Sequence, residues 1–283
     1  MARFTNQAQL RYGNSIANSN IAVGEILEVL SAEKTAVKAE YTPNDCVTYV
    51  ISIVNAGTTA MNGLSVTDNL GTYLQAETEL TPLRYVEGSV KYYVNGVLQS
   101  TPVVVDGPPL VINGINVPAG GDVIIVYEAD INEYAPLAAG SQITNTATIA
   151  GAGITPITAE EVITAVQAPM LTITKSISPV PVTENGTLTY TFLIQNMGNA
   201  QVDETVGAIV TDTFNPILSN PVVTFNGTAW TQTTNYTYDE TTGVFATNTG
   251  QITVPAATYA RDPVTNAVVV TPGVSTLVIA GII

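Results

Sequence analysis

The chain contains two copies of one sequence pattern, and this repeat constrains the fold more than any other feature. Residues 33–57 (EKTAVKAEYTPNDCVTYVISIVNAG) match residues 174–198 (TKSISPVPVTENGTLTYTFLIQNMG), which aligns Lys34 with Lys175. Further on, an SVTDNL segment matches an IVTDTF segment and aligns Asp68 with Asp212. Such a repeat predicts two structurally equivalent domains.

The two copies differ at their ends. The first copy continues to a last apolar segment, ITNTATI at 143–149, whereas the second stops at residues 271–283, which align with an earlier strand of the first copy. The second copy is therefore expected to lack its last strand. A similar segment, FTNQAQL at 4–10, stands at the other end of the chain and aligns Asn6 with Asn145.

The connecting segment is repeated as well. Lys34 follows Asn6 by 28 residues, and Lys175 follows Asn145 by 30. We therefore interpret the N-terminal segment as a displaced last strand. Alternation places five of its side chains on one face: Phe4, Asn6, Ala8, Leu10 and Tyr12.

The predicted fold class is all-β. Runs rich in Val, Ile, Thr and Tyr alternate with Gly, Pro and Asn turns, helical periodicity is almost absent, and the spacing of the runs is typical of β-sandwiches. We predict a donor-strand arm over 1–25, a complete sandwich over 26–165 and a second sandwich over 166–283 that lacks its last strand.

A missing strand leaves an apolar groove with unpaired backbone groups, which favours the addition of a strand from elsewhere. The arm could fold back into its own second domain, but the whole first domain lies between them. Insertion into the next subunit would be a heterologous contact that generates a filament. The alternatives are that residues 1–25 form a frayed tail, or that the natural protein continues past Ile283.

Composition excludes several classes of function. The net charge is −15, which disfavours binding to nucleic acid or to an anionic membrane, and no apolar run is long enough to span a bilayer. The chain has no histidine, and Cys46 is the only cysteine, so neither a His-dependent triad nor an internal disulfide can form. We expect no cofactor, no metal site and no enzymatic turnover.

Three polar side chains in each copy are predicted to point into the core. Alternation puts Lys175 on the same face as Ile173 and Ile177, and it groups Asp68, Asp212, Asn145 and Asn6 with apolar neighbours in the same way. A buried trio of Lys, Asp and Asn fits self-catalysed isopeptide formation, because burial favours a neutral amine that attacks the carboxamide and a neutral acid that assists.

Each of these residues also has a simpler interpretation. A lysine on an edge strand discourages aggregation, an aspartate after a strand commonly caps a turn, and a buried asparagine often bonds to backbone. The three aromatic residues Trp230, Tyr236 and Tyr238 could form a platform for sugars, but strand packing is the simpler expectation.

The motifs resemble a known family. The pattern of K-T/S, then G/N-D/N-x-V/L-T-Y, N-x-G, V-T-D and T-N-T-A-T resembles the conserved-repeat Ig-like domain of bacterial surface proteins, a domain of undefined function. The order Lys, Asp, Asn also resembles the collagen-adhesin type of sandwich, which forms Lys–Asn isopeptide bonds. The resemblance implies a Lys34–Asn145 bond assisted by Asp68, and an intersubunit Lys175–Asn6 bond assisted by Asp212.

The sequence therefore predicts a structural subunit of an extracellular bacterial filament, whose partners are identical subunits. The alternative is a modular adhesin that binds a glycan or a host protein. The N-terminus has no apolar core of a secretion signal and we find no sorting motif. A spore-surface appendage, released when the mother cell lyses, would need neither.

Overall fold

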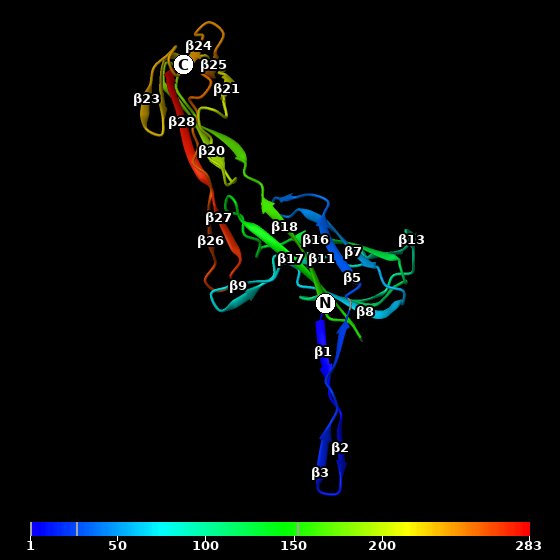
Figure 1. The fold of residues 1–283 in the computed structure, drawn as a ribbon. Helices are drawn as coiled ribbons and strands as arrows, with labels where there is room; N and C mark the ends of the chain where they lie inside the picture. Colours follow the sequence, from blue (N-terminus) through cyan, green and yellow to red (C-terminus); the bar gives the residue numbers. More distant parts are fainter. Residues whose placement is uncertain (1, 27, 152) are drawn as a thin grey trace. The chain divides into compact units, whose positions relative to one another are not determined.

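The computed structural model describes residues 2–26, 28–151 and 153–283 (Figure 1). These residues form β-strands and no helix, so the predicted all-β class is confirmed. The chain divides into two compact units. Unit 1 contains residues 1–135 and 143–163, and unit 2 contains residues 136–142 and 164–283. Each unit has sheets in a sandwich-like arrangement.

Unit 1 has two main sheets. The first has the order β13-β12-β16-β7-β5, with β11 beside β16. Its strands are β13 (Val97–Leu98), β12 (Lys91–Val94), β16 (Asp122–Ile131), β7 (Cys46–Asn55), β5 (Leu30–Ala36) and β11 (Leu83–Tyr85). The second has the order β14-β15-β8-β17-β18-β6. Its strands are β14 (Val103–Val105), β15 (Leu110–Val117), β8 (Met61–Asp68), β17 (Gln142–Ala150), β18 (Ile157–Ala165) and β6 (Glu40–Tyr41).

The core of unit 1 follows from strict alternation along these strands. In β7, Val47, Tyr49, Ile51 and Ile53 are buried, while the residues between them are partly exposed. Strands β16 and β17 alternate in the same way. Because side chains of a strand point to opposite faces in turn, each sheet buries one apolar face against the other. A small hairpin of β9 (Tyr73–Gln75) and β10 (Thr78–Leu80) lies outside these sheets.

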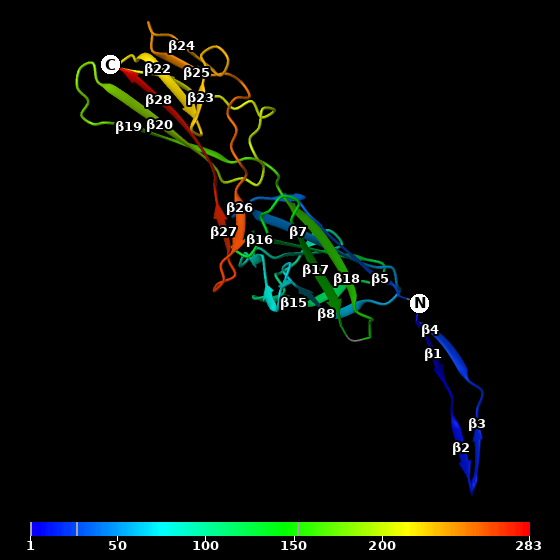
Figure 2. The same ribbon diagram turned by 90° about the vertical axis from the view of Figure 1, so that its left-hand side faces the viewer.

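Unit 2 has one large sheet and one small sheet (Figure 2). The large sheet has the order β19-β20-β28-β22-β23, formed by β19 (Leu171–Ser178), β20 (Thr187–Asn196), β28 (Gly273–Ile282), β22 (Ser219–Phe225) and β23 (Thr228–Trp230). The small sheet contains β21 (Thr211–Thr213), β25 (Val244–Thr247) and β24 (Tyr236–Tyr238), and a separate hairpin pairs β26 (Thr258–Arg261) with β27 (Val268–Thr271). The buried core of unit 2 includes Phe214, Phe245 and Leu277.

Two asparagines show that the units are structurally equivalent. The Nδ2 of Asn55 donates to the carbonyls of Thr59 and Pro118, and its Oδ1 accepts from the amide of Gly57. Asn196 makes the matching bonds to residue 200, to a proline carbonyl at 255 and from the amide of Gly198. The alignment of the two copies is thus reproduced bond by bond at the end of β7 and β20.

The units differ in the second sheet. In unit 1 the second sheet continues beyond β8 with β17 and β18. In unit 2, β21 pairs with β25 alone among the described residues. Strand β19 is exposed along its whole length, and Ile173 and Ile177 are both about half exposed. Three strands of the sheet, β17, β18 and β6, are without a counterpart in the described part of unit 2, where the sequence predicted one missing strand.

The N-terminal arm is a two-stranded ribbon. Strand β1 (Ala2–Asn6) pairs with β4 (Ala22–Ile26), and β2 (Gln9–Tyr12) pairs with β3 (Ser15–Asn18) across a turn at Gly13 and Asn14. The sequence predicted only the first of these two chain segments as a strand. Apart from Gly24, which is partly buried, the residues of the arm whose exposure is described are all exposed, so the ribbon has no core of its own.

Candidate functional site: two Lys–Asp pairs

Three strands of unit 1 bring Lys34, Asp68 and Asn145 into its core. Lys34 comes from β5 in the first sheet, whereas Asp68 ends β8 and Asn145 lies in β17 of the second sheet. The Nζ of Lys34 lies 2.7 Å from Oδ2 of Asp68, and both side chains are fully buried. Asn145 is fully buried as well. A buried charge pair of this kind is expensive unless further contacts or chemistry accompany it.

Tyr127 connects Asp68 to Asn145. Its hydroxyl donates to Oδ2 of Asp68 at 2.6 Å and accepts a hydrogen bond from Nδ2 of Asn145 at 2.9 Å. A continuous chain of hydrogen bonds therefore leads from the Lys34 amine to the Asn145 amide. Tyr127 was not among the residues predicted for this site. Alternation along β16 nevertheless places its side chain on the buried face together with Ile125.

A second tyrosine closes the site from the other side. The ring of Tyr49 stacks on that of Tyr127 at 5.4 Å between centroids, and Nζ of Lys34 lies 4.9 Å from the Tyr49 ring centroid. The Tyr49 hydroxyl and Oδ1 of Asn145 are both buried without a hydrogen bond of good geometry. Even so, the Asn145 amide is near enough to lower the pKa of Tyr49, against the larger rise that burial causes. A hydroxyl and a carbonyl oxygen are thus both left unpaired in the core of unit 1.

Burial lowers the pKa of Lys34 from 10.5 to about 8. The loss of hydration around the ammonium is the main cause, and the Asp68 carboxylate opposes it. The structure therefore makes the amine of Lys34 much easier to deprotonate than an ordinary lysine, which is the property that a nucleophilic amine requires.

The simpler roles of these residues are only partly present. Asp68 does cap the turn that follows β8, since its Oδ1 accepts a hydrogen bond from the amide of Leu70 at 3.0 Å. Lys34, however, has no exposed surface with which to discourage edge pairing. Asn145 donates to a tyrosine hydroxyl, whereas the simpler interpretation placed its bond on the backbone.

In unit 2, Lys175 and Asp212 also form an ion pair, but in an open setting. The Lys175 side chain is 39% exposed, so the prediction that it is buried is wrong for the single chain. The amine still points toward the core side of the sheet, with Nζ 4.4 Å from the Tyr190 ring centroid and 5.3 Å from that of Phe214. It remains exposed because no strand corresponding to β17 covers it in the described part of unit 2.

Two residues of the site in unit 1, Tyr127 and Asn145, have no counterpart in the described part of unit 2. Tyr190 corresponds to Tyr49, but the residue paired with Tyr190 on β28 is Ile279, where unit 1 has Tyr127 paired with Tyr49. The residue that the sequence assigned to complete this site, Asn6, lies in β1 opposite Ala22, with its side chain exposed.

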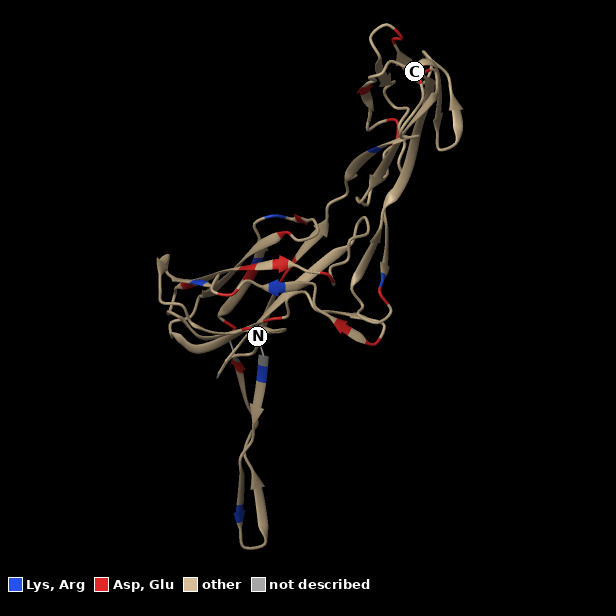
Figure 3. Ribbon diagram, turned by 180° about the vertical axis from the view of Figure 1, so that it is seen from behind, with Lys and Arg blue, Asp and Glu red and all other residues tan. Residues whose placement is uncertain are grey.

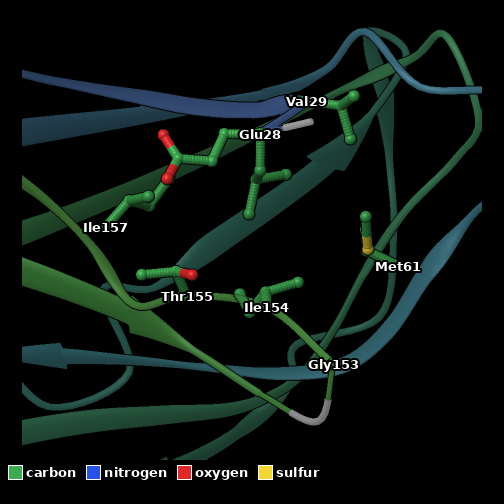
Figure 4. A pocket seen from close by; sticks show the side chains of 8 residues that line it. Glu28, Val29, Met61, Gly153, Ile154, Thr155 and Ile157 are labelled. Carbon is green, nitrogen blue, oxygen red and sulfur yellow. The ribbon is translucent and has the colours of Figure 1, made fainter. Parts of the chain in front are cut away.

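Other candidate residues do not form a binding site for small molecules. Tyr236 and Tyr238 are buried, and Trp230 stacks on Phe225 at 4.8 Å between centroids, so these aromatic residues pack the core. Cys46, at the start of β7, is exposed. A pocket of about 60 Å³ next to Met61 is lined mainly by apolar side chains, with Glu28 at its rim (Figure 4).

Within residues 2–26, 28–151 and 153–283, no group of His, Cys, Asp and Glu side chains is arranged to hold a metal ion. The same residues contain no helix of the length and apolarity that crossing a membrane requires.

Comparison with known proteins gives only distant likenesses. No family model and no curated protein matches the sequence. Among solved structures, the major pilin subunit BcpA of Bacillus cereus is 14% identical with a TM-score of 0.38, over 96% of this chain and 73% of BcpA. The pilus backbone RrgB of Streptococcus pneumoniae is 14% identical with a TM-score of 0.35, over 86% of this chain and 55% of RrgB.

The collagen-binding domain of a Staphylococcus aureus adhesin is 13% identical with a TM-score of 0.30, over 47% of this chain and 96% of that domain. The chain spans about half the length of the RrgB structure.

Proposed function

We propose that the protein is the structural subunit of an extracellular bacterial filament, in which the N-terminal arm of one subunit completes unit 2 of the next. One observation carries this proposal. The Lys34–Asp68 pair is fully buried under the Asn145 strand, whereas the equivalent Lys175–Asp212 pair is partly exposed. The sequence segment that matches the Asn145 strand is the arm.

Exposed apolar side chains on both surfaces support the same pairing. Phe4, Leu10 and Tyr12 of the arm are more than half exposed, as is Ile173 on the open strand β19. Covering such surfaces removes apolar area from water, which stabilises by about 25 cal/mol per Å². An exposed sheet edge also provides backbone groups to which an added strand can bond.

Charge supports it as well. The arm carries Arg3 and Arg11 against the single acid Glu25, whereas unit 2 has two basic residues against seven acids (Figure 3). The opposite signs favour encounter between the arm of one subunit and unit 2 of another. They disfavour contact between two acidic units, which supports ordered addition over random aggregation.

In the proposed chemistry, unit 1 cross-links itself between Lys34 and Asn145. The neutral amine of Lys34 attacks Cγ of Asn145, a new C–N bond forms, the bond from Cγ to Nδ2 breaks, and ammonia leaves. Asp68 accepts a proton from the attacking amine, and one proton must reach the departing nitrogen. Nothing is oxidised or reduced, and no cofactor takes part.

We assign Tyr127 the transfer of that proton. Its hydroxyl bonds to Asp68 on one side and to the leaving Nδ2 on the other, so a proton can pass from the acid to the departing nitrogen. In the proposed step, the otherwise unpaired hydroxyl of Tyr49 donates to Oδ1 of Asn145 as negative charge develops there.

The corresponding intersubunit bond would join Lys175 to Asn6, assisted by Asp212. Tyr190 is present for the role of Tyr49, but Ile279 cannot relay a proton as Tyr127 does. We therefore expect the intersubunit bond to form more slowly than the bond within unit 1, and non-covalent strand donation to hold the filament first.

The test uses the full chain and paired variants of the arm. We expect the purified protein to form filaments visible by electron microscopy, and Leu10→Asp, on the apolar face of β2, to abolish them. The matched control is Gln7→Ala, which lies on the other face of the arm and should assemble normally. Normal filaments from Leu10→Asp, or none from the unaltered chain, would contradict the proposal. Retention of glycan or host-protein binding by a non-assembling chain would favour the adhesin alternative.

A further inference from the structure

The sheet that is complete in unit 1 extends three strands beyond β8, namely β17, β18 and the short strand β6. Strand β17 pairs with β8, and β18 lies beside β17 in the same sheet. The second of these strands also helps to seal the core, since Ala159, Ile163 and Ala165 are buried. A single donated strand would replace β17 in unit 2 and leave the place of β18 open.

The arm offers two strands rather than one. After β1 and β2 the chain turns at Gly13 and returns as β3 and β4, which pair with the outgoing segment along most of its length. The β17–β18 connection is longer than the turn of the arm. This agrees with the smaller spacing between Asn6 and Lys34 than between Asn145 and Lys175.

The ribbon has one apolar face to which both strands contribute. Residues opposite each other on paired strands project to the same side. Phe4 faces Gly24, and Leu10 faces Ala17, so large side chains of the outgoing strands lie beside small residues of the returning strands. A Cβ at position 24 would collide with the Phe4 ring, so only glycine allows the ring to lie across the ribbon.

The opposite face is the more polar one, although Val23 and Ile16 also lie on it, opposite Thr5 and Arg11. Arg3 lies opposite Glu25 and bonds to it at 2.7 Å, and Gln9 lies opposite Asn18. The face that carries Phe4 and Leu10 is therefore the one suited to a core, as the inner face of β17 and β18 is in unit 1.

We propose that the arm docks into a second copy of this chain as a preformed hairpin and replaces the counterparts of both β17 and β18. The inference rests on the proposed filament and specifies its donor. The outgoing strand pairs with β21, and the returning strand covers the outer edge that a single strand would leave unpaired. An isolated ribbon is only marginally stable in water, so docking also stabilises the arm.

The repeat sets the register of docking. In unit 1, Thr148 pairs with Thr67 and Ile149 pairs with Val66. Transfer of these pairs through the two alignments places Gln9 opposite Thr211, and Leu10 opposite Val210, of the receiving subunit. Asn6 then lies near the Lys175–Asp212 pair, as Asn145 lies near its own pair.

The test locks the hairpin with a disulfide. In the Cys46→Ser background, the paired residues on the polar face are replaced as Thr5→Cys and Val23→Cys. Residues opposite each other on antiparallel strands are close enough for a disulfide. A docking hairpin tolerates this link, whereas a single inserting strand must separate from its partner and cannot. The chain is assembled in oxidising and in reducing buffer, with Thr5→Cys alone as the control.

The expected result is equal assembly in both buffers, with the disulfide recovered intact from filaments by peptide mass analysis. Assembly only after reduction would overturn the hairpin and leave single-strand donation standing. Failure of the disulfide to form in the free chain would also overturn it, because the two strands would not be paired. Absence of filaments from the unaltered chain would refute the proposed function itself, an outcome distinct from the other two.

Discussion

Replacing Asn145 with alanine removes the acceptor of the proposed cross-link in unit 1 while leaving the Lys34–Asp68 pair in place. The variant therefore separates the covalent bond from the buried charge pair, which substitution of either charged residue would not do. Removal of one partner from a buried pair leaves an uncompensated charge and destabilises by about 3–5 kcal/mol for that reason alone.

The magnitude follows from the positions of the linked residues. Lys34 lies near the start of unit 1 and Asn145 near its end, so the cross-link closes a loop of about 110 residues. In the chain-entropy treatment of disulfides this stabilises the fold by about 5 kcal/mol. Loss of the Asn145–Tyr127 hydrogen bond adds about 1 kcal/mol. For a unit of this size the midpoint of thermal unfolding should fall by about 10–20 °C.

The assay combines intact mass with thermal unfolding. The unaltered chain should weigh one ammonia less than its sequence predicts for each bond formed, and Asn145→Ala should retain its full mass. A suitable control is Thr148→Ala, a residue of β17 that faces away from the core. A full unmodified mass for the original chain, or equal midpoints for the chain and Asn145→Ala, would refute the cross-link.

Three further predictions concern the same groups. Tyr127→Phe should slow the loss of ammonia after refolding by about 100-fold, as measured by mass spectrometry, and an unchanged rate would refute proton transfer through Tyr127. Ile279→Tyr should speed formation of the intersubunit bond. In Asn145→Ala the free amine of Lys34 has a pKa of about 8, below the 10.5 of the unfolded chain. Between these pKa values the unfolded state binds more protons than the folded state, so the free energy of unfolding should rise by about 1.5 kcal/mol from pH 8 to 9.5. Urea titration measures this rise, which should be absent from the cross-linked chain. Lys175→Ala should still assemble but should yield only monomers after boiling in detergent, where the unaltered chain yields a ladder; a ladder from the variant would place the bond elsewhere.

Much of this protein follows from local sequence pattern. The alternation of apolar and polar residues determines the strands and their buried faces, because side chains of a strand point to opposite sides in turn. The two copies were recognisable from matching residues, and the aligned Asn55 and Asn196 make the same set of hydrogen bonds. Alternation predicted that Asp68 and Asn145 face the core of unit 1, and the alignment of Lys34 with Lys175 predicted the same for Lys34; the structure buries all three.

Other features depend on contacts between segments far apart in the sequence. Tyr127 bridges Asp68 and Asn145 only because two sheets face each other, and nothing within β16 shows which polar groups lie opposite. The partial exposure of Lys175 has the same origin, since burial depends on a covering strand rather than on the residue's own strand.

The arm shows the same division between sequence and structure. Its similarity to the ITNTATI segment is visible from residues 4–10, but in the returning segment Ile16, Ile21 and Val23 are separated by small and polar residues without strict alternation. Its pairing is apparent only where Gly24 lies under the ring of Phe4. Sequence by itself determined the strands, the repeat and the inward residues, because these depend on neighbours along the chain. Tertiary structure alone decided which polar groups meet and which strands remain uncovered, because these depend on neighbours in space.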